Sequence, residues 1–392
     1  MKKTIFYVGY NVFPVGFGQT QRELLISKGL TEKGCRVVIL CRYGTYAPGK
    51  IANILAEGTF DGVEYKYCSG SAYRGQSFFK RNLKKLKGFL NEIGTIIKGK
   101  MSGDLKAILI TTNSFDNILL YSILGKLLNV QTVIDNTEYW TAVKRHKFAL
   151  GDKLYDKYSY KIIDKVICIS DFLLEKSASK KPAALVKIPS IVDFSKFESF
   201  DFISKPGFEY FLFCGSAVYY PVIEFIINAF NLIQDRKISL VLICGNGGKG
   251  DYDKIDQKIA ASNKKDLIHF KSNLAYSELV GWYKGSLALL IPLRPTNEDA
   301  ARFPHKIGEY CASKRPIVTT NFGEIMYYFK DGVNAFVSGE YEPQSYANAL
   351  QNVLKDKNVT EMIASRSFET GKNNFDYTVC GETAFNLIYN SY

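Results

Sequence analysis

The feature that most constrains the fold is a succession of strand, glycine-containing loop, helix and strand at the beginning of the chain. Residues 4–9 are apolar, a loop with Gly16 and Gly18 follows, residues 20–33 carry apolar side chains at helical spacing, and residues 35–40 are apolar again. Two strands joined through a helix run parallel, with a right-handed crossover. The pattern therefore predicts an α/β fold built on a parallel sheet.

The same succession begins again in the second half of the chain. Residues 210–214 predict a strand, Gly215 and Ser216 open a loop, and residues 221–234 predict a helix that leads into a strand over 240–244. At 392 residues the chain is also too long for one ordinary core. We therefore expect two doubly wound, Rossmann-like domains.

The predicted domain boundaries follow from the polar segment between the two halves. The N-terminal domain spans residues 1–195 and the C-terminal domain spans residues 208–372, with a mostly polar linker over about 194–207. A further helix is expected over about residues 373–392. Each domain is large enough to hold a hydrophobic core of its own.

The first glycine loop resembles only part of the fingerprint by which dinucleotide-binding folds hold a pyrophosphate. Gln21 stands where that fingerprint requires a third glycine. The strand over 35–40 is followed by Cys41 and Arg42, so it lacks the acid that would bind a ribose. The sequence therefore argues against a nicotinamide-dependent enzyme.

The positive charge is confined to the first half of the chain. Residues 1–200 hold 31 Lys/Arg and 17 Asp/Glu, a balance of +14, whereas residues 201–392 hold 20 and 21, a balance of −1. The excess peaks over 80–87, followed by apolar residues that continue to Ile97. Such a segment is typical of a helix on an anionic membrane surface or near a polyphosphate acceptor, and also of a solvated helix face. The residues expected to share its apolar face are Leu83, Leu86, Phe89 and Leu90.

Cysteine and histidine usage argues against a metal site. None of the eight cysteines forms a C-x-x-C pair, and Cys168, Cys214 and Cys244 lie inside apolar strand patterns. Only three histidines are present, and no apolar run approaches the roughly 18 residues that span a bilayer. We expect no metal, no cofactor and no nucleic-acid partner. We also expect a cytoplasmic protein, with a peripheral position on the inner membrane face as the alternative.

A candidate ligand site lies in the segment from Arg302 to Tyr310. Pro304 suits the first turn of a helix, and Ile307 and Tyr310 recur at helical spacing. Lys306 and Glu309, three positions apart, then share one side of that helix. A cation near a helix N-terminus that faces a carboxylate suits a ligand with a phosphate at one end and hydroxyls at the other. A solvent-exposed ion pair is the alternative.

The run from Arg302 to Val318 resembles the donor segment of retaining GT-B glycosyltransferases of the family 4 type, also called glycosyl transferases group 1. The resemblance implies that the two domains face each other across a cleft and that the terminal helix returns to the first domain. It also implies that Lys306 and Arg302 bind the diphosphate and that Glu309 binds the ribose. The family often carries a sugar-binding glutamate eight positions earlier, where this chain has Ala301.

The resemblance extends to several loops of both domains. The opening glycine loop would line the cleft beside the acceptor and the diphosphate, and Glu138, after a strand over 132–134, would lie near the sugar and acceptor. Helix capping by Asp135 or Asn136 is the alternative for that loop. The donor-binding positions implied are Gly16, Gly18, Gly215, Ser216, Gly245, Asn273, Leu274, Glu309, Gly323 and Glu324.

Two further motifs admit a structural interpretation. The basic run over 144–147 is either an acceptor-phosphate contact or plain surface. Asp251 and Asp253 match a D-x-D pattern that holds a metal in another glycosyltransferase fold. They follow a glycine loop and begin a helix, where acids are favoured by the helix dipole, so we expect them to cap it.

Together these patterns predict transfer of a sugar from a nucleotide-diphosphate sugar to an acceptor hydroxyl. By resemblance the reaction retains configuration and serves surface polysaccharide or glycan assembly. The partners are the donor, a glycan or lipid-linked acceptor, and an anionic membrane surface. Two alternatives remain, a nucleotide-sugar 2-epimerase of the same fold and a non-catalytic glycan-binding subunit.

Overall fold

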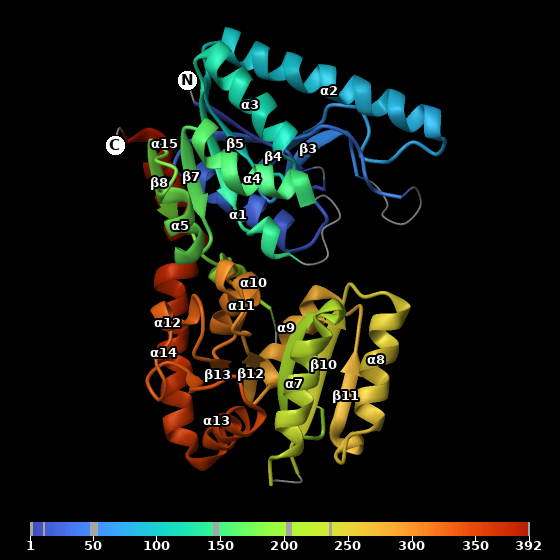
Figure 1. Cartoon of the computed structure of the whole chain (residues 1–392), viewed down its shortest axis with the longest axis vertical. Coiled ribbons are helices and arrows are strands. Elements are labelled where there is room, and N and C mark those ends of the chain that lie inside the picture. Colours follow the sequence, from blue (N-terminus) through green and yellow to red (C-terminus); the bar gives the residue numbers. More distant parts are fainter. Residues whose placement is uncertain are drawn as a thin grey trace. The chain divides into compact units, whose positions relative to one another are not determined.

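The computed structural model of the chain divides into two compact units (Figure 1). Unit 1 comprises Met1–Ile191 and Tyr377–Tyr392, and unit 2 comprises Val192–Asp376. The chain therefore leaves unit 1, forms all of unit 2 and comes back. The residues that the structure describes are 3–10, 12–47, 54–143, 149–200, 206–234 and 237–390.

Unit 1 contains a sheet with the strand order β3-β4-β2-β1-β5-β6-β7-β8. All neighbouring strands are parallel except β3, which pairs antiparallel with β4 at the edge. The central strand β1 is buried along its whole length, because helices cover both faces of the sheet. The strands are β1 (Thr4–Val8), β2 (Arg36–Cys41), β3 (Glu57–Phe60), β4 (Val63–Tyr67), β5 (Leu105–Ile110), β6 (Gln131–Asn136), β7 (Lys165–Cys168) and β8 (Ala184–Lys187).

The helices of unit 1 divide between the two faces of this sheet according to the direction of each crossover. The chain moves one way from β1 to β2 and the other way from β4 onward, so right-handed crossovers place α1 on one face and α2 to α5 on the other. Figure 1 shows α3 and α4 in front of the sheet. The helices are α1 (Gly18–Glu32), α2 (Phe78–Met101), α3 (Phe115–Leu128), α4 (Ala149–Ile162), α5 (Asp171–Ala178) and α15 (Tyr377–Tyr389), with a short 3-10 turn over Trp140–Ala142.

The last helix, α15, packs against α1 through two glycines. A Cβ added to Gly29 would lie 2.6 Å from the Cα of Gly381. The two helix backbones are therefore so close that a side chain at this position would not fit. Leu387 and Ile388 of α15 join the same buried core as Leu25 and Ile26 of α1. The C-terminal segment is therefore an integral layer of unit 1.

Unit 2 contains a sheet with the strand order β11-β10-β9-β12-β13-β14, and every neighbouring pair is parallel. Its apolar strands are again buried on both faces, as in β12, where all four residues are buried. The strands are β9 (Tyr210–Ser216), β10 (Ser239–Gly245), β11 (Ile268–Lys271), β12 (Ala288–Ile291), β13 (Ile317–Thr320) and β14 (Phe336–Ser338).

The helices of unit 2 connect these strands and close the unit. The short helix α6 and the long helix α14 lie at its two chain ends, where the backbone N–H of Val192 donates to the carbonyl of Phe375 at 2.9 Å. The helices are α6 (Phe194–Glu198), α7 (Tyr220–Asn231), α8 (Lys249–Ala260), α9 (Tyr276–Gly285), α10 (Asn297–Ala301), α11 (Lys306–Ala312), α12 (Ile325–Tyr328), α13 (Pro343–Lys355) and α14 (Lys357–Phe375), with 3-10 turns over Ala217–Tyr219 and Lys265–Leu267.

The predicted two-domain α/β architecture with parallel sheets is confirmed. The predicted terminal helix is α15, which belongs to unit 1 but begins at Tyr377, because residues 373–375 end α14 and the backbone of Asp376 is extended. Two other details of the prediction are wrong. The linker over 194–207 begins with helix α6, which Asp193 caps by accepting from the backbone N–H of Lys196 at 2.9 Å. Pro304 precedes helix α11, which begins at Lys306, and does not lie in its first turn.

Candidate functional site

The strand order of unit 2 places a topological switch point between β9 and β12. From β9 the chain proceeds outward through β10 to β11, and from β12 it proceeds outward in the opposite direction through β13 to β14. In open parallel sheets, ligands bind beyond the carboxyl ends of the strands at such a point. The segments that lie there are the end of β9 at Gly215 and Ser216 with the turn that follows, and the loop after β12, which contains Arg294.

Helix α11 is fixed beside this switch point by Tyr310, which is fully buried. The hydroxyl of Tyr310 accepts from the backbone N–H of Cys214 in β9 at 2.9 Å and donates to the carbonyl of Leu290 in β12 at 3.4 Å. One side chain therefore satisfies backbone groups of both strands. Because the helix has only seven residues, this anchor also determines where Lys306 and Glu309 lie.

Lys306 and Glu309 form an ion pair, with 2.7 Å between Nζ and Oε2. Burial is the largest single influence and lowers the pKa of Lys306, but the Glu309 carboxylate, with a smaller contribution from Cys214, leaves that pKa raised. The side chains are 31% and 17% exposed, so both remain accessible to a ligand. The hydroxyl of Tyr276 donates to the other carboxylate oxygen of Glu309 at 3.4 Å, which adds an aromatic side chain to the site.

A second charged cluster follows β12 and surrounds Arg302. Its Nη1 donates to Oε1 of Glu298 at 2.8 Å and to the hydroxyl of Tyr219 at 2.9 Å. Arg294 bonds the other oxygen of Glu298 at 3.1 Å and holds Asp299 through two hydrogen bonds of 2.6 and 2.8 Å. These carboxylates, Asp299 above all, raise the pKa of Arg294. The cluster carries two guanidinium groups and two carboxylates at one edge of the sheet.

Ala301 occupies the position where the family often has a sugar-binding glutamate. Ala301 is 1% exposed and ends the short helix α10, so it packs inward. Glu298 lies one turn earlier on the same helix and is directed at Arg302. Its carboxylate occupies the charged cluster although its sequence position is out of register with the family pattern.

The predicted residues after β9 and β10 lie next to each other. The hydroxyl of Ser216 donates to the carbonyl of Asn246 at 3.3 Å and accepts from the backbone N–H of Val218 at 3.4 Å. Apart from its two chain neighbours, no atom of the described residues lies within 4 Å of the place that a Cβ on Gly245 would occupy. Ser216 and Gly245 end two neighbouring strands and are paired in register, so with Gly215 their backbones reach the carboxyl edge of the sheet.

The remaining predicted positions of unit 2 also follow strand ends. Asn273, with a left-handed φ of 56°, is exposed after β11, and Leu274 beside it is half-buried. Gly323 follows β13 with a φ of 60°, and a Cβ there would lie 3.4 Å from the carbonyl oxygen of Asp299. Glu324 is buried at the start of α12. All these segments share the carboxyl edge, but Asn273 belongs to the outermost strand β11, away from the switch point.

In unit 1 the predicted residues lie at the carboxyl edge of the other sheet. Gly18 is the first residue of α1, and Gly16 is in the loop before it, where a Cβ would collide with the side chain of Thr20. Glu138 is half-buried in the loop after β6. Gln19 links α1 to the same edge, because its side-chain amide donates to the hydroxyl of Thr111, which follows β5, at 2.8 Å.

Asp135, considered above as a helix cap, has a different role. It forms a fully buried ion pair with Arg22 of α1, and it accepts a hydrogen bond from the hydroxyl of Tyr7 at 2.9 Å. Arg22 also donates to the carbonyls of Ile188 and Pro189 at 2.8 and 2.6 Å. The periodicity of residues 20–33 gave no signal for a buried arginine.

Two other sequence motifs have different outcomes. The basic run over 144–147 lies outside the described residues. The carboxylate of Asp251 accepts from the backbone N–H of Gly248 at 3.0 Å, so the capping interpretation of that aspartate is confirmed. Within the described ranges no group of three His, Cys, Asp or Glu side chains is placed to hold a metal ion.

Comparison with solved structures defines the class of fold. A sucrose-phosphate synthase from Thermosynechococcus elongatus superposes with a TM-score of 0.73 at 14% identity, covering 99% of this chain and 98% of that one. A glycosyltransferase from Rickettsia africae gives the same values. The Anabaena protein HepE in complex with UDP-glucose gives 0.68 at 13% identity, covering 98% and 99%. The chain therefore has the two-domain GT-B fold.

Comparison with protein families gives a match within the second unit. Residues 195–370 are similar to the family Glycosyl transferases group 1. A sequence comparison with curated proteins finds no match. The matched range contains α10, α11 and the charged cluster around Arg302, together with every predicted donor-binding residue of unit 2.

Proposed function

We propose that this protein is a glycosyltransferase that moves a sugar from a nucleotide-diphosphate sugar to an acceptor hydroxyl. The observation that carries the proposal is the Lys306–Glu309 pair, held by Tyr310 beside the switch point of a unit that is similar to Glycosyl transferases group 1. A cation and a carboxylate 2.7 Å apart present one group for phosphate and one for hydroxyls. The HepE structures with UDP and with UDP-glucose make UDP-sugars the first donors to test.

In this proposal the chemistry depends on charge stabilisation. As the bond between sugar and diphosphate breaks, negative charge grows on the departing phosphate, and the cations of Lys306 and Arg302 stabilise it. Glu309 accepts hydrogen bonds from the ribose hydroxyls and so positions the donor. The departing phosphate oxygen accepts the proton of the acceptor hydroxyl, so no separate base is needed.

The loops at the carboxyl edge of unit 2 complete the proposed donor site. The backbones of Gly215, Ser216 and Gly245 approach the diphosphate, and Asn273 with Leu274 contacts the base. Gly323 and Glu324 lie beside the sugar. In unit 1 we assign Gly16 and Gly18 to the diphosphate and acceptor, and Glu138 to the sugar and acceptor as a catalytic group.

The finer features of the proposal come from the family resemblance. We propose retention of configuration, hexosyl transfer of the family 4 type, and a role in surface polysaccharide or glycan assembly without a metal or other cofactor. The proposed acceptor is a glycan or lipid-linked glycan at the cytoplasmic face of the membrane. No helix in the described part of the chain is long and apolar enough to cross a bilayer.

A panel of nucleotide sugars, added one at a time during thermal unfolding, tests the proposal. A donor at 100 times its dissociation constant stabilises the protein by about 2.7 kcal/mol. We expect one donor to do so for the native protein and to lose this effect in Glu309→Ala, while Glu342→Ala, at an unrelated helix start, retains it. If no nucleotide sugar stabilises the native protein, the proposal is wrong.

The same samples distinguish the alternatives. Incubation of the stabilising donor alone, followed by NMR, would reveal inversion at sugar carbon 2 if the protein were an epimerase. A donor that binds but is neither transferred to any acceptor in a glycan panel nor hydrolysed would indicate a non-catalytic glycan-binding subunit. The buried Ala301 is the specific observation that favours this second candidate.

A further inference from the structure

Helix α2 is the longest helix of unit 1 and contacts the rest of the unit along one narrow face. Gly88, Glu92 and Ile96 are its buried residues, one turn apart. Glu92 pairs with Arg42, with 2.6 Å between Oε2 and Nε, and accepts from the hydroxyl of Tyr121 at 2.9 Å. These contacts determine which side of α2 faces the sheet.

The opposite side of α2 carries an exposed apolar stripe. Its members recur at intervals of three and four residues, with one gap of seven between Leu90 and Ile97, which keeps them on one face of a helix. Phe79 is 78% exposed and Met101, at the other end, is 81% exposed. We call these residues the α2 stripe: Phe79, Leu83, Leu86, Leu90, Ile97 and Met101. The sequence prediction was wrong for Phe89, which turns inward and lies 5.3 Å from the guanidinium of Arg42.

Cations flank the α2 stripe and no free acid accompanies them. Lys80, Lys87 and Lys98 each follow a stripe residue directly and are exposed, so they line one border of the stripe. None of the three forms an ion pair with the described part of the chain. The only acid of α2 is Glu92, which is buried against Arg42. The exposed side of the helix therefore carries the apolar stripe, and all of its charged side chains are cations.

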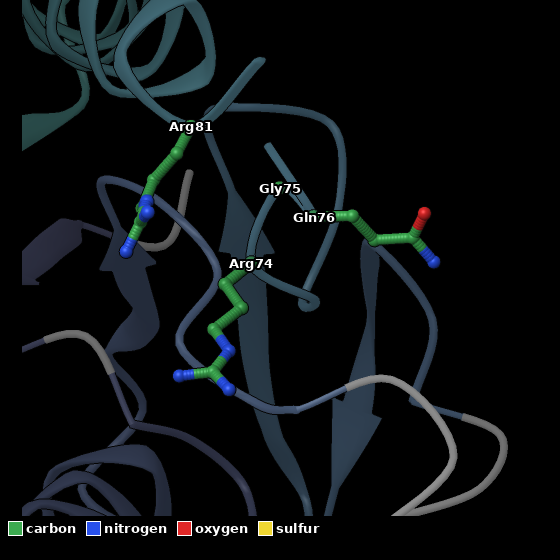
Figure 2. A pocket seen from close by; sticks show the side chains of 4 residues that line it. All are labelled: Arg74, Gly75, Gln76 and Arg81. Atoms are coloured by element: carbon green, nitrogen blue, oxygen red, sulfur yellow. The ribbon is translucent and has the colours of Figure 1, made fainter. Parts of the chain in front are cut away.

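A separate pocket of about 420 Å³ lies at the N-terminal end of α2, where Arg81 is two helical turns before the buried Gly88 and therefore not on the side of the stripe. Figure 2 shows the guanidinium groups of Arg74 and Arg81 directed to the same side of the loop, while Gln76 points away. Gly75 makes the arrangement possible, because a Cβ there would lie 2.7 Å from the backbone nitrogen of Arg81. Neither guanidinium bonds a side chain among the residues described. Two guanidinium groups directed to one side suit an anion such as phosphate, but this pocket is not part of the α2 stripe.

We infer that α2 docks on an anionic phospholipid bilayer. The helix lies along the surface with the α2 stripe among the headgroups and upper acyl chains and its lysines over anionic lipids. A second copy of this chain is a poorer occupant, because pairing two α2 helices would bring lysines together with no exposed acid to oppose them. The inference stands independently of the proposed function.

Vesicle sedimentation tests the inference on the full chain. At roughly 50 mM salt, we expect the native protein to bind phosphatidylcholine vesicles that contain about 30 mol% phosphatidylglycerol and to leave pure phosphatidylcholine vesicles unbound. Each cation near such a surface contributes about 1 kcal/mol, so Lys80→Ala with Lys87→Ala should weaken partitioning about 30-fold. Binding that is equal on both vesicle types, or absent, overturns the inference.

Matched variants in unit 2 control for net charge and surface hydrophobicity. Lys265→Ala with Lys355→Ala removes the same charge from exposed positions and should change partitioning less than about threefold. Leu86→Ser with Leu90→Ser should weaken binding at least tenfold, whereas Val359→Ser with Met362→Ser on α14 should not. If a control pair loses as much binding as its α2 counterpart, the α2 surface is not the docking site.

The Phe79→Trp variant reports the depth of the helix directly. With anionic vesicles, the fluorescence of the introduced indole should shift to shorter wavelength, and lipids brominated on the acyl chains should quench it. Light scattering of the free protein examines the competing occupant. A dimer that dissociates in Leu86→Ser with Leu90→Ser, together with no fluorescence shift on vesicles, would assign the stripe to self-association and overturn the inference.

Discussion

Arg22 and Asp135 form an ion pair whose side chains have no exposed area, with 2.9 Å between Nη2 and Oδ1. Arg22 lies near the start of α1 and Asp135 near the end of β6, so the pair joins the first helix to the carboxyl edge of the sheet. Two further hydrogen bonds from Arg22 reach the carbonyls of Ile188 and Pro189, just before the chain enters unit 2. The pair therefore holds the end of β6 in place, and the loop that contains Glu138 follows directly after it.

Breaking this pair should destabilise unit 1 strongly. Asp135→Asn leaves the Arg22 guanidinium buried without an opposing charge, which costs about 3–5 kcal/mol in comparable cases. Denaturant unfolding followed by circular dichroism measures the loss. Asp61→Asn is the control, because its partner Lys28 is 3.8 Å away and both are partly exposed, so it should cost less than about 1 kcal/mol. Similar losses in the two variants would contradict the buried pair.

Glu23, the neighbour of Arg22, should make stability depend on pH. Burial, with a smaller contribution from Asp135, raises its pKa well above the ordinary value. The folded state therefore keeps this proton at a pH where the unfolded chain has lost it, so the free energy of unfolding falls as pH rises above about 4.5. Each unit of pKa difference costs about 1.4 kcal/mol. Glu23→Gln removes this penalty.

We therefore expect Glu23→Gln to raise the melting temperature, and to raise it more at pH 8 than at pH 5. Its Oε2 finds no hydrogen-bond partner in the described ranges, so the amide displaces no existing bond there. Glu57→Gln on the exposed edge strand β3 should behave alike at both pH values. A gain that is independent of pH would show that Glu23 is ionised in the folded protein.

The two members of the donor pair should affect different kinetic constants. Lys306→Ala removes a cation that acts on charge growing in the transition state, so kcat should fall on the order of 100-fold or more with little change in melting temperature. Glu309→Gln should chiefly raise KM for the donor, because it acts on the bound ground state. Steady-state kinetics with the identified donor separates the two. Full activity in Lys306→Ala would remove the central residue of the proposal.

Transfer should not depend on a divalent metal held by the D-x-D motif. Asp251 already caps α8 through the backbone N–H of Gly248, so Asp251→Asn with Asp253→Asn should cost about 1 kcal/mol of stability or less and leave donor affinity nearly unchanged. Activity assayed with EDTA, with and without added magnesium or manganese, checks this. If either metal restored activity lost in EDTA, Asp251 would have a role beyond capping α8.

Much of the fold was predictable because buried parallel strands leave long apolar runs. The runs that became β1, β9 and β10 were found on that basis. The missed strands are β3, β4, β8 and β14, which are short or lie at sheet edges, where polar and apolar residues alternate. Edge strands receive half of their environment from solvent, so their sequences resemble those of loops.

The candidate site was predictable only where two residues act within one helix. Lys306 and Glu309 are three positions apart, and helical geometry alone brings them together. Tyr219 and Tyr276 reach the site from other elements, and no spacing in the sequence relates them to Arg302 or Glu309. Glu298 was noted as out of register, and only the course of α10 shows that it faces Arg302. Contacts between distant segments require the fold.

The return of α15 to unit 1 has a consequence for the order in which the protein is made. Gly381 must meet Gly29 before the face of the sheet that α1 covers is complete, yet Val192–Asp376 emerges from the ribosome in between. At about 5–20 residues per second, synthesis of that stretch takes on the order of 10–40 s. During that interval the nascent unit 1 exposes the apolar groove that Leu387 and Ile388 will fill. Unit 2, which is continuous in sequence, can therefore finish folding first, although its synthesis begins second.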